Sequence, residues 1–168
     1  SSDLLSVIKA INLIPAADRL PLVVIGEQKK VLYREAIFSY IAEHRLEKWL
    51  IFPNSVTNDD LPAVYQGAEI FIYTSLYEGF GIPVLEALVS GVPVITSNVS
   101  GMSEAGGPDS RLVNPRNIDE ISTSITELLG DDELRGEMIQ KGYLHAARFS
   151  NQQVTTKLID LYHQIIDI

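Results

Sequence analysis

Cysteine is absent from this chain of 168 residues, and basic residues are few. Without cysteine there is no disulfide and no thiolate metal site, which fits a reducing compartment but does not prove one. Lysine and arginine number 13 against 22 aspartates and glutamates, so the net charge is −9. That balance disfavours nucleic acid as a partner, because a surface that binds many phosphates is normally basic. One bound nucleotide is still compatible with it, since a nucleotide needs only a few local donors.

Long apolar runs and targeting patterns are also missing. No run approaches the ~20 residues that a membrane-spanning helix requires, so we expect no transmembrane segment. The chain opens with Ser1-Ser2-Asp3 and has no signal-peptide pattern. Its hydrophobic content of 46% is that of a globular protein, and its length suits one domain. Residues 3–11 already have helical spacing, an abrupt start that suggests a segment cut from a longer protein.

Short apolar runs alternate along the chain with segments of helical spacing. The apolar runs predict strands at residues 21–26, 49–52, 70–73, 93–96 and 111–113. Periodicity and capping signals predict helices at residues 4–14, 31–43, 60–65, 83–88, 117–130, from 131 or 132 onward, and 150–165. The expected caps are the cluster Asp59-Asp60, Asn117 with Glu120 three positions later, and Asp131 or Asp132. Such alternation predicts an α/β fold, with a Rossmann-like doubly wound parallel sheet and helices on both faces. After residue 116 we expect a helical C-terminus.

A glycine turn joins the third predicted strand to a helix that begins near Pro83. This turn lies at the carboxyl edge of a parallel strand, where open α/β sheets bind their ligands. Gly79 and Gly81 allow the backbone to approach a ligand closely. The N–H groups from Gly81 to Val84 lie at a helix N-terminus, which is an anion site suited to a pyrophosphate.

Two glutamates flank this turn, Glu78 before it and Glu86 about one helical turn after it. The carboxylate oxygens of Glu86 can accept hydrogen bonds from a vicinal diol such as a ribose. Glu78 can face whatever lies beyond the phosphate. A plainer interpretation stays open at this point, because the helix dipole alone favours glutamate near a helix N-terminus.

The stretch from Glu78 to Leu88, followed by Gly91-Val92-Pro93-Val94-Ile95, resembles the E-x7-E signature of glycosyltransferase family 4. Members of that family are retaining, nucleotide-sugar-dependent enzymes of the two-domain GT-B fold. Other family patterns recur in the same order: "LPALYxxADVF" at residues 61–71, "LVDP" at 112–115 and the "FSW" entry to the last helix at 147–150. The resemblance covers nearly the whole chain and is more specific than a lone glycine motif.

The resemblance implies that residues 1–168 are the C-terminal, nucleotide-sugar-binding domain of a GT-B glycosyltransferase. It assigns Glu78 to the catalytic centre, against the hydroxyls of the donor sugar, and Glu86 to the ribose hydroxyls. The remaining substrate-binding positions are Phe80, Gly81, Ile82, Pro83 and Val84, whose backbone holds the sugar and the diphosphate. The family generally works without a metal, so we expect no metal site and no cofactor besides the sugar-nucleotide donor. Positive side chains and helix N-termini stabilise the leaving diphosphate instead.

The chain also departs from the family pattern. The arginine and lysine that grip the diphosphate in the family precede the first helix of this domain, whereas this chain starts at Ser1. The first strand of the domain and both basic residues are therefore not in the sequence. Lys29 and Lys30 are candidates to face phosphate, although a solvated loop is the simpler interpretation. The family often has a proline before the acidic residue that Glu104 matches, and Ser103 stands here, so that loop is expected to differ.

Other chemistry-bearing residues form weaker patterns. His44, His145 and His163 lack metal-ligand spacing, and we expect them to be packing or surface residues. A glycoside-hydrolase carboxylate pair is an alternative interpretation of Glu78 and Glu86. The parallel-sheet pattern and the glycine turn favour a phosphate ligand over it.

Two tyrosines and two serines lie near the turns at the sheet edge. Tyr73 and Tyr77 flank the glycine turn, and packing in the core or at the rim is their default role, ahead of stacking on a sugar ring. Ser75 and Ser100 lack the G-x-S-x-G pattern of a nucleophile elbow.

We interpret the chain as the donor domain of a retaining hexosyltransferase, which transfers a sugar from a nucleoside diphosphate sugar to a hydroxyl acceptor. The missing N-terminal domain would hold that carbohydrate or lipid-linked acceptor, so the isolated fragment is expected to be inactive. By family habit the product is a cell-envelope polysaccharide or glycolipid. The expected location is the cytoplasm, with peripheral attachment of the whole protein to the inner membrane left open. The alternative hypothesis is a sugar-nucleotide-binding module without catalysis.

Overall fold

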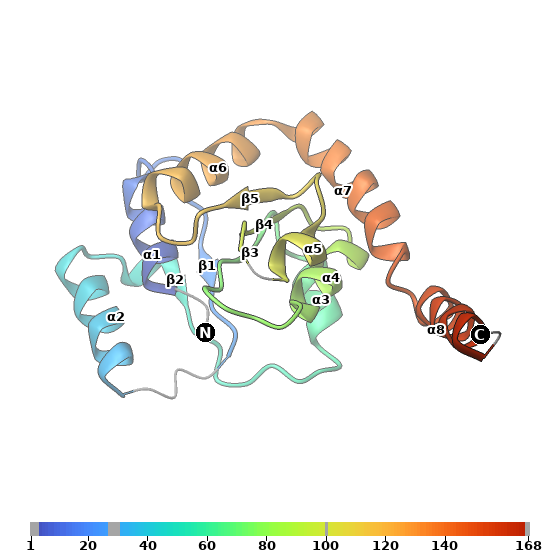
Figure 1. The fold of residues 1–168 in the computed structure, drawn as a ribbon. Helices are drawn as coiled ribbons and strands as arrows, with labels where there is room; N and C mark the ends of the chain where they lie inside the picture. The colour runs from blue at the N-terminus through green and yellow to red at the C-terminus, as the bar shows by residue number, and fades with distance from the viewer. Residues whose placement is uncertain (1–3, 27–30, 100, 167–168) are drawn as a thin grey trace.

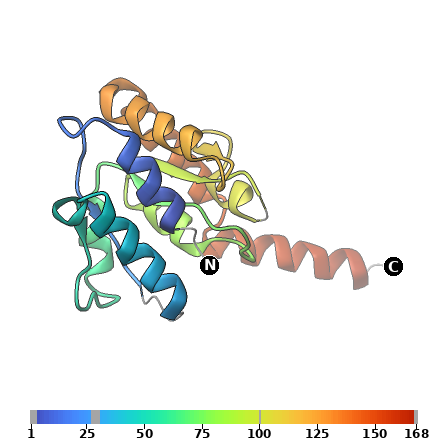
Figure 2. The ribbon, with the colours of Figure 1, turned by 90° about the vertical axis from the view of Figure 1, so that its left-hand side faces the viewer.

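The computed structural model describes residues 4–26, 31–99 and 101–166, and Figures 1 and 2 show it from two sides. Helices and strands alternate until β5, as predicted, and helices follow. The elements are α1 (Leu4–Leu13), β1 (Leu22–Val23), α2 (Val31–Glu43), the 3-10 helix η1 (Glu47–Trp49), β2 (Leu50–Ile51), α3 (Leu61–Gln66), β3 (Phe71–Tyr73), α4 (Ile82–Val89), β4 (Val94–Ser97), α5 (Met102–Gly106), β5 (Arg111–Val113), α6 (Ile118–Gly130), α7 (Asp132–Ala147) and α8 (Asn151–Ile166).

All strand pairs are parallel, as the alternation predicted. β1 pairs with β2, with Leu22 opposite Leu50, and β3, β4 and β5 form a second group in that order. Within the described residues β1 and β3 do not pair, so the sheet is divided between them. β1 and β2 are shorter than predicted, and Trp49 belongs to η1 rather than to a strand.

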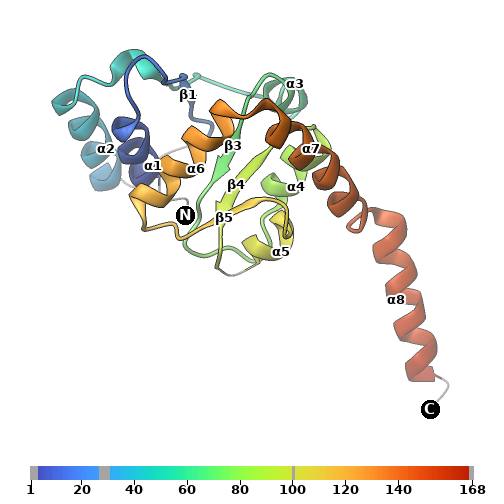
Figure 3. The same cartoon turned by 90° about the horizontal axis from the view of Figure 1, so that it is seen from above.

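Helices cover both faces of the β3–β4–β5 group. Successive strand residues point to opposite faces, and accordingly Ile95 packs with α1 and α6 while its neighbour Val94 packs with α4 and α5. Figure 3 shows α1 and α6 on one side of these strands and α4 and α5 on the other. A third cluster joins α1, α2 and β2. The predicted two-faced architecture is confirmed.

The helix caps predicted at Asn117 and Asp131 form in the structure, whereas the one predicted at Asp60 does not. Asn117 Oδ1 accepts a hydrogen bond from the Glu120 N–H (3.2 Å), and Asp131 Oδ1 accepts one from the Leu134 N–H (2.8 Å), as predicted. Asp60 precedes α3 but makes no capping bond, because its carboxylate instead accepts bonds from the N–H and Oγ1 of Thr57. Those two bonds lower the pKa of Asp60.

The C-terminal region is helical, as predicted, and α8 extends away from the body of the domain (Figures 1 and 3). Three of its apolar side chains are at least half exposed, those of Val154, Leu161 and Ile165. α5 was not predicted. It occupies the segment around Glu104, where the sequence indicated only a loop.

Candidate functional site

The glycine turn begins where β3 ends, and two hydroxyl groups of β4 hold that strand end. Thr96 Oγ1 donates a hydrogen bond to the Tyr73 carbonyl (3.0 Å), and Ser97 Oγ donates one to the Ser75 carbonyl (2.6 Å). Both hydroxyl residues are fully buried. β4 therefore fixes the position from which the turn departs.

The two glycines of the turn differ in what a side chain at their position would meet. Gly81 precedes α4 with φ +96°, in the left-handed region, and a Cβ there would lie 2.9 Å from Met102 Sδ. A side chain at position 81 would thus be both strained and crowded. Gly79 has no such φ, and a Cβ there would have no atom of the described residues within 4 Å. The described residues leave the space beside Gly79 open.

The backbone amides of the turn form a smaller anion site than the sequence indicated. Pro83 has no N–H, and the Val84 N–H donates to the Gly81 carbonyl at 2.9 Å. The Val84 side chain is fully buried, so this residue contributes to packing. Among the described residues, the amides of Phe80, Gly81 and Ile82 have no backbone acceptor. These three N–H groups are the donors available to an anion at the helix N-terminus.

Each of the two glutamates is half-buried and is held by a tyrosine hydroxyl. Tyr65, on α3, donates a hydrogen bond to Glu86 Oε2 at 2.9 Å, across 21 positions of sequence. Tyr73, on β3, donates one to Glu78 Oε1 at 3.0 Å. Ser75 Oγ lies 3.4 Å from the same Glu78 oxygen. The carboxylates stand on either side of the turn, as the sequence indicated.

The two tyrosines remain protonated hydrogen-bond donors far above neutral pH. Burial raises the pKa of Tyr65 above the usual value of 10.0, and the hydrogen bond to Glu86 and the charge of that carboxylate raise it further. Burial and the hydrogen bond to Glu78 raise the pKa of Tyr73 to about 12. Of the two tyrosines weighed from the sequence, Tyr73 packs beside Phe71 whereas Tyr77 is 80% exposed.

The backbone of the turn is supported from behind by the residue before α5. A Cβ on Gly101 would overlap the Gly79 carbonyl and the Phe80 backbone. The Phe80 ring also packs against Phe149, with ring centroids 5.2 Å apart. The turn therefore contacts both the residue before α5 and the segment that leads into α8.

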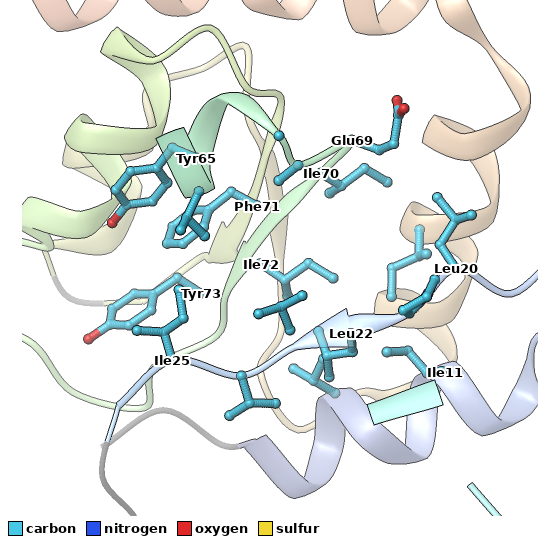
Figure 4. Close-up of a pocket in the computed structure, with 18 of the residues that line it drawn as sticks. Ile11, Leu20, Leu22, Ile25, Tyr65, Glu69, Ile70, Phe71, Ile72 and Tyr73 are labelled. Atoms are coloured by element: carbon cyan, nitrogen blue, oxygen red, sulfur yellow. The ribbon is translucent and has the colours of Figure 1, made fainter. Parts of the chain in front are cut away.

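A cavity of about 570 Å³ lies between β1 and β3. Its walls are mostly apolar and come from α1, α3, α6 and the two strands, with Glu86 and Pro83 also in its lining. Figure 4 shows Ile72 of β3 and Leu22 of β1 facing this space. Apolar walls do not suit a diphosphate, so the cavity is distinct from the amide site of the turn.

No group of histidines, cysteines or carboxylates in the described residues could hold a metal ion. His145 Nε2 donates to the Glu104 carbonyl at 2.9 Å, and His44 Nδ1 lies 3.0 Å from the Tyr40 carbonyl oxygen. Both of these histidines are thus engaged with nearby backbone. Among the described helices, none is both long enough and apolar enough to span a bilayer.

The structure brings most of the predicted site together at one turn, from Glu78 through Ile82, with Glu86 on the following helix. Lys29 and Lys30 lie outside the described residues. Sequence reasoning missed four contributions: the bond from Tyr65 to Glu86, the bond from Tyr73 to Glu78, Ser75 as a neighbour of Glu78, and Gly101 behind the turn. Only Tyr73 and Ser75 are close enough to Glu78 in sequence for a local pattern to have suggested their contacts.

Comparison with known proteins identifies the family. The family of glycosyl transferases group 1 matches residues 3–145. The chain belongs to this family. The O-antigen chain mannosyltransferase B of Escherichia coli is 34% identical to it over 161 residues, which are 92% of this chain and 41% of that protein. The chain thus spans less than half the length of this relative.

Solved glycosyltransferase structures share the fold. The C-terminal domain of the group 1 protein LpcC from Francisella tularensis superposes with a TM-score of 0.77 at 25% identity, covering 87% of this chain and 78% of that one. Anabaena HepE, solved in complex with UDP-glucose, has a TM-score of 0.81 at 20% identity, covering 95% and 45% of the two chains. The fold is that of a GT-B glycosyltransferase C-terminal domain, as the resemblance implied.

Proposed function

We propose that this domain binds the donor in a retaining hexosyltransferase. In the complete polypeptide, an acceptor hydroxyl would replace the nucleoside diphosphate at the anomeric carbon of the sugar, with the configuration kept. The observation that carries this proposal is the pair of half-buried carboxylates, Glu78 and Glu86, on either side of the amide-lined N-terminus of α4. A sugar–diphosphate–ribose ligand has its hydroxyls and its negative charge in that same order.

Each part of the site has one role in this proposal. Glu86 accepts hydrogen bonds from the ribose hydroxyls, and Glu78 accepts them from the sugar. The amides of Phe80, Gly81 and Ile82 hold the diphosphate, and the positive end of α4 stabilises the charge that grows on it as it leaves. The proposal includes no metal ion and no cofactor besides the donor.

The relatives indicate which donors to test first. The name of the Escherichia coli relative favours mannose as the hexose, and the HepE complex adds UDP-glucose to the candidates. A role in cell-envelope polysaccharide or glycolipid synthesis follows from the same relative. A cytoplasmic location, with peripheral attachment to the inner membrane through the rest of the protein, belongs to this proposal.

The test is a sugar-transfer assay on the complete polypeptide with Glu78→Gln. Loss of a hydrogen-bonding charge beside the reacting sugar is expected to lower kcat by roughly 100-fold. Glu137→Gln, on the exposed side of α7, is the matched control and should keep full activity. Activity in Glu78→Gln equal to that of the control would refute the catalytic assignment. Donor binding without any transfer by the wild-type polypeptide would favour the module without catalysis.

The gap between β1 and β3 also has a proposed occupant, a parallel strand that precedes α1 in the complete polypeptide. The Leu5 N–H, at the start of α1, donates to Tyr33 Oη, at the start of α2, at 3.1 Å. α1 therefore begins at the carboxyl edge of the sheet, where β1 also leads into α2. A strand in the gap that joined α1 by a short connection would run parallel to β1 and β3.

The chemistry of the gap favours a strand over a small ligand. The Val24 N–H donates to the Ile51 carbonyl, and the Phe71 N–H donates to the Pro93 carbonyl. Since backbone groups alternate in direction along a strand, those of Val23 and Ile72 face the gap. An extended segment supplies partners to both edges at once, and with both faces covered it should be about five or six apolar residues long.

A further inference from the structure

Three aromatic side chains form a row, and each end of the row contacts one of the two site glutamates. Tyr65 packs edge-on against Phe71, with ring centroids 5.3 Å apart, and Phe71 stacks beside Tyr73 at 6.1 Å. Figure 4 shows the three rings on the same side of β3, opposite Ile70 and Ile72. We call this row, Tyr65–Phe71–Tyr73, the aromatic ladder.

The ends of the ladder bind different parts of the site. The Tyr65 hydroxyl donates to Glu86 Oε2 at 2.9 Å, and the Tyr73 hydroxyl donates to Glu78 Oε1 at 3.0 Å. Phe71, in the middle, has no polar group and touches both tyrosine rings. The two glutamates are thus attached to one packed row, although one belongs to the turn and the other to α4.

The rings themselves are held by the core. All three pack against the buried cluster that contains Val84 and Leu88 of α4, Val94 of β4 and Met102 of α5. A hydroxyl group on such a ring has little freedom to move away from its partner.

A glutamate side chain has several rotatable bonds, and fixing them upon ligand binding costs conformational entropy. A hydrogen bond from a rigid ring pays that cost at folding, before any ligand arrives. Both glutamate side chains would then be oriented before the ligand binds. The ladder does this for the two ends of the site at once.

We propose that the aromatic ladder is the positioning element that holds Glu86 and Glu78 for the two halves of the donor. Tyr65, Phe71 and Tyr73 are positioning residues, because they act through the glutamates. This inference rests on the proposed function and adds a specific prediction to it. Losing the Tyr65 hydroxyl should affect the ribose half of the donor, and losing the Tyr73 hydroxyl should affect the sugar half.

The alternative is that each bond only satisfies the hydrogen-bonding requirement of the tyrosine hydroxyl, since buried tyrosine hydroxyls usually find a partner. A purely structural role would lower stability without distinguishing the halves of the donor. Tyr40→Phe provides a matched control, because the Tyr40 hydroxyl accepts a bond from Asn12 Nδ2 at 3.2 Å, outside the site.

The experiment is calorimetric titration of the complete polypeptide with UDP, GDP and ADP, each beside its glucose or mannose conjugate. Tyr65→Phe should weaken the bound nucleoside diphosphate and its sugar conjugate equally, by roughly tenfold. Tyr73→Phe should weaken only the sugar conjugate, by a similar factor. Phe71→Leu keeps an apolar side chain but removes the central ring, and it should show both losses.

Glu86→Gln and Glu78→Gln separate this inference from the proposed function. If both glutamine variants weaken the donor but Tyr65→Phe and Tyr73→Phe bind as Tyr40→Phe does, the ladder is refuted and the proposed function stands. If neither glutamine variant changes binding, the proposed function is refuted, and the ladder with it. The split between the two halves of the donor, seen in the tyrosine variants, would establish the ladder even if all three tyrosine variants lose equal stability.

Discussion

Gly101 packs directly against the backbone of the glycine turn, where a Cβ would lie 2.8 Å from Phe80 Cα. The neighbouring atoms are backbone and cannot rotate away, so a methyl group at position 101 must displace the turn. We expect Gly101→Ala to lower the free energy of unfolding by about 1–3 kcal/mol and to weaken donor binding, because the amides of the turn move. Thermal denaturation and titration with a sugar nucleotide measure the two effects.

A second glycine provides the control for Gly101→Ala. Gly136 lies inside α7, and a Cβ there would have no atom of the described residues within 4 Å. Gly136→Ala should therefore stabilise the fold by about 1 kcal/mol, through helix propensity alone, and leave donor binding unchanged. Gly101→Ala with wild-type stability and binding would contradict the packing described for the turn.

The two glycines of the turn should respond differently to alanine. Gly81→Ala forces a left-handed φ on a residue with a side chain and should cost about 1–2 kcal/mol of stability. Gly79→Ala meets no described atom, so its stability should match that of the wild type. If a ligand lies against Gly79, the same variant should still bind the sugar nucleotide more weakly. Unchanged binding in Gly79→Ala would place the ligand elsewhere.

Parts of the fold and of the site were predictable because their signals are local. Asn117 and Asp131 cap helices through bonds to residues three positions away, and Pro83 with two glycines marks the start of α4. Asp60 had the same local signal but bonds backward to Thr57, because a carboxylate takes whichever nearby donor the chain geometry offers.

Other parts depend on tertiary structure and leave no local pattern. The bond from Tyr65 to Glu86 joins residues 21 positions apart, and nothing near either residue indicates it. The division of the sheet between β1 and β3 is likewise invisible in strand signals, which describe single segments and not their neighbours. α5 was missed because its five residues are too few for a helical period to emerge.

The loss of folding stability at alkaline pH should depend on the hydrogen bonds from the two tyrosines to the glutamates. The pKa of Tyr73 is raised to about 12 in the folded protein, against a value near 10 in an unfolded chain. Since the folded pKa is the higher one, its contribution to stability is complete below pH 10 and is lost as the pH rises from 10 to 12. The raised pKa of Tyr65 acts in the same direction.

Denaturant midpoints measured across that pH window test this prediction. Tyr73→Phe should begin less stable at neutral pH and lose less stability between pH 10 and 12 than the wild type does. Tyr162→Phe, on the exposed side of α8, is the control and should follow the wild type. Equal alkaline loss in Tyr73→Phe and the wild type would contradict the assigned bond to Glu78.

The gap between β1 and β3 is tested by amide hydrogen exchange. The N–H groups of Val23 and Ile72 face the gap, whereas Ile95 lies in β4, which is paired on both sides. In the complete polypeptide, exchange at Val23 and Ile72 should be slower than in residues 1–168 alone by roughly tenfold or more, and exchange at Ile95 should be unchanged. Equal exchange in the two proteins would exclude a strand in the gap.

The central claim is that Glu86 binds the ribose of a nucleoside diphosphate sugar, and titration calorimetry tests it most directly. The complete polypeptide and its Glu86→Gln and Glu137→Gln variants would be titrated with UDP, GDP and ADP and with their glucose or mannose conjugates. We predict that one nucleotide binds, and that Glu86→Gln alone weakens it by roughly tenfold, which is about 1.4 kcal/mol. Equal affinity in both variants, or no binding of any nucleotide to the complete polypeptide, would contradict the account.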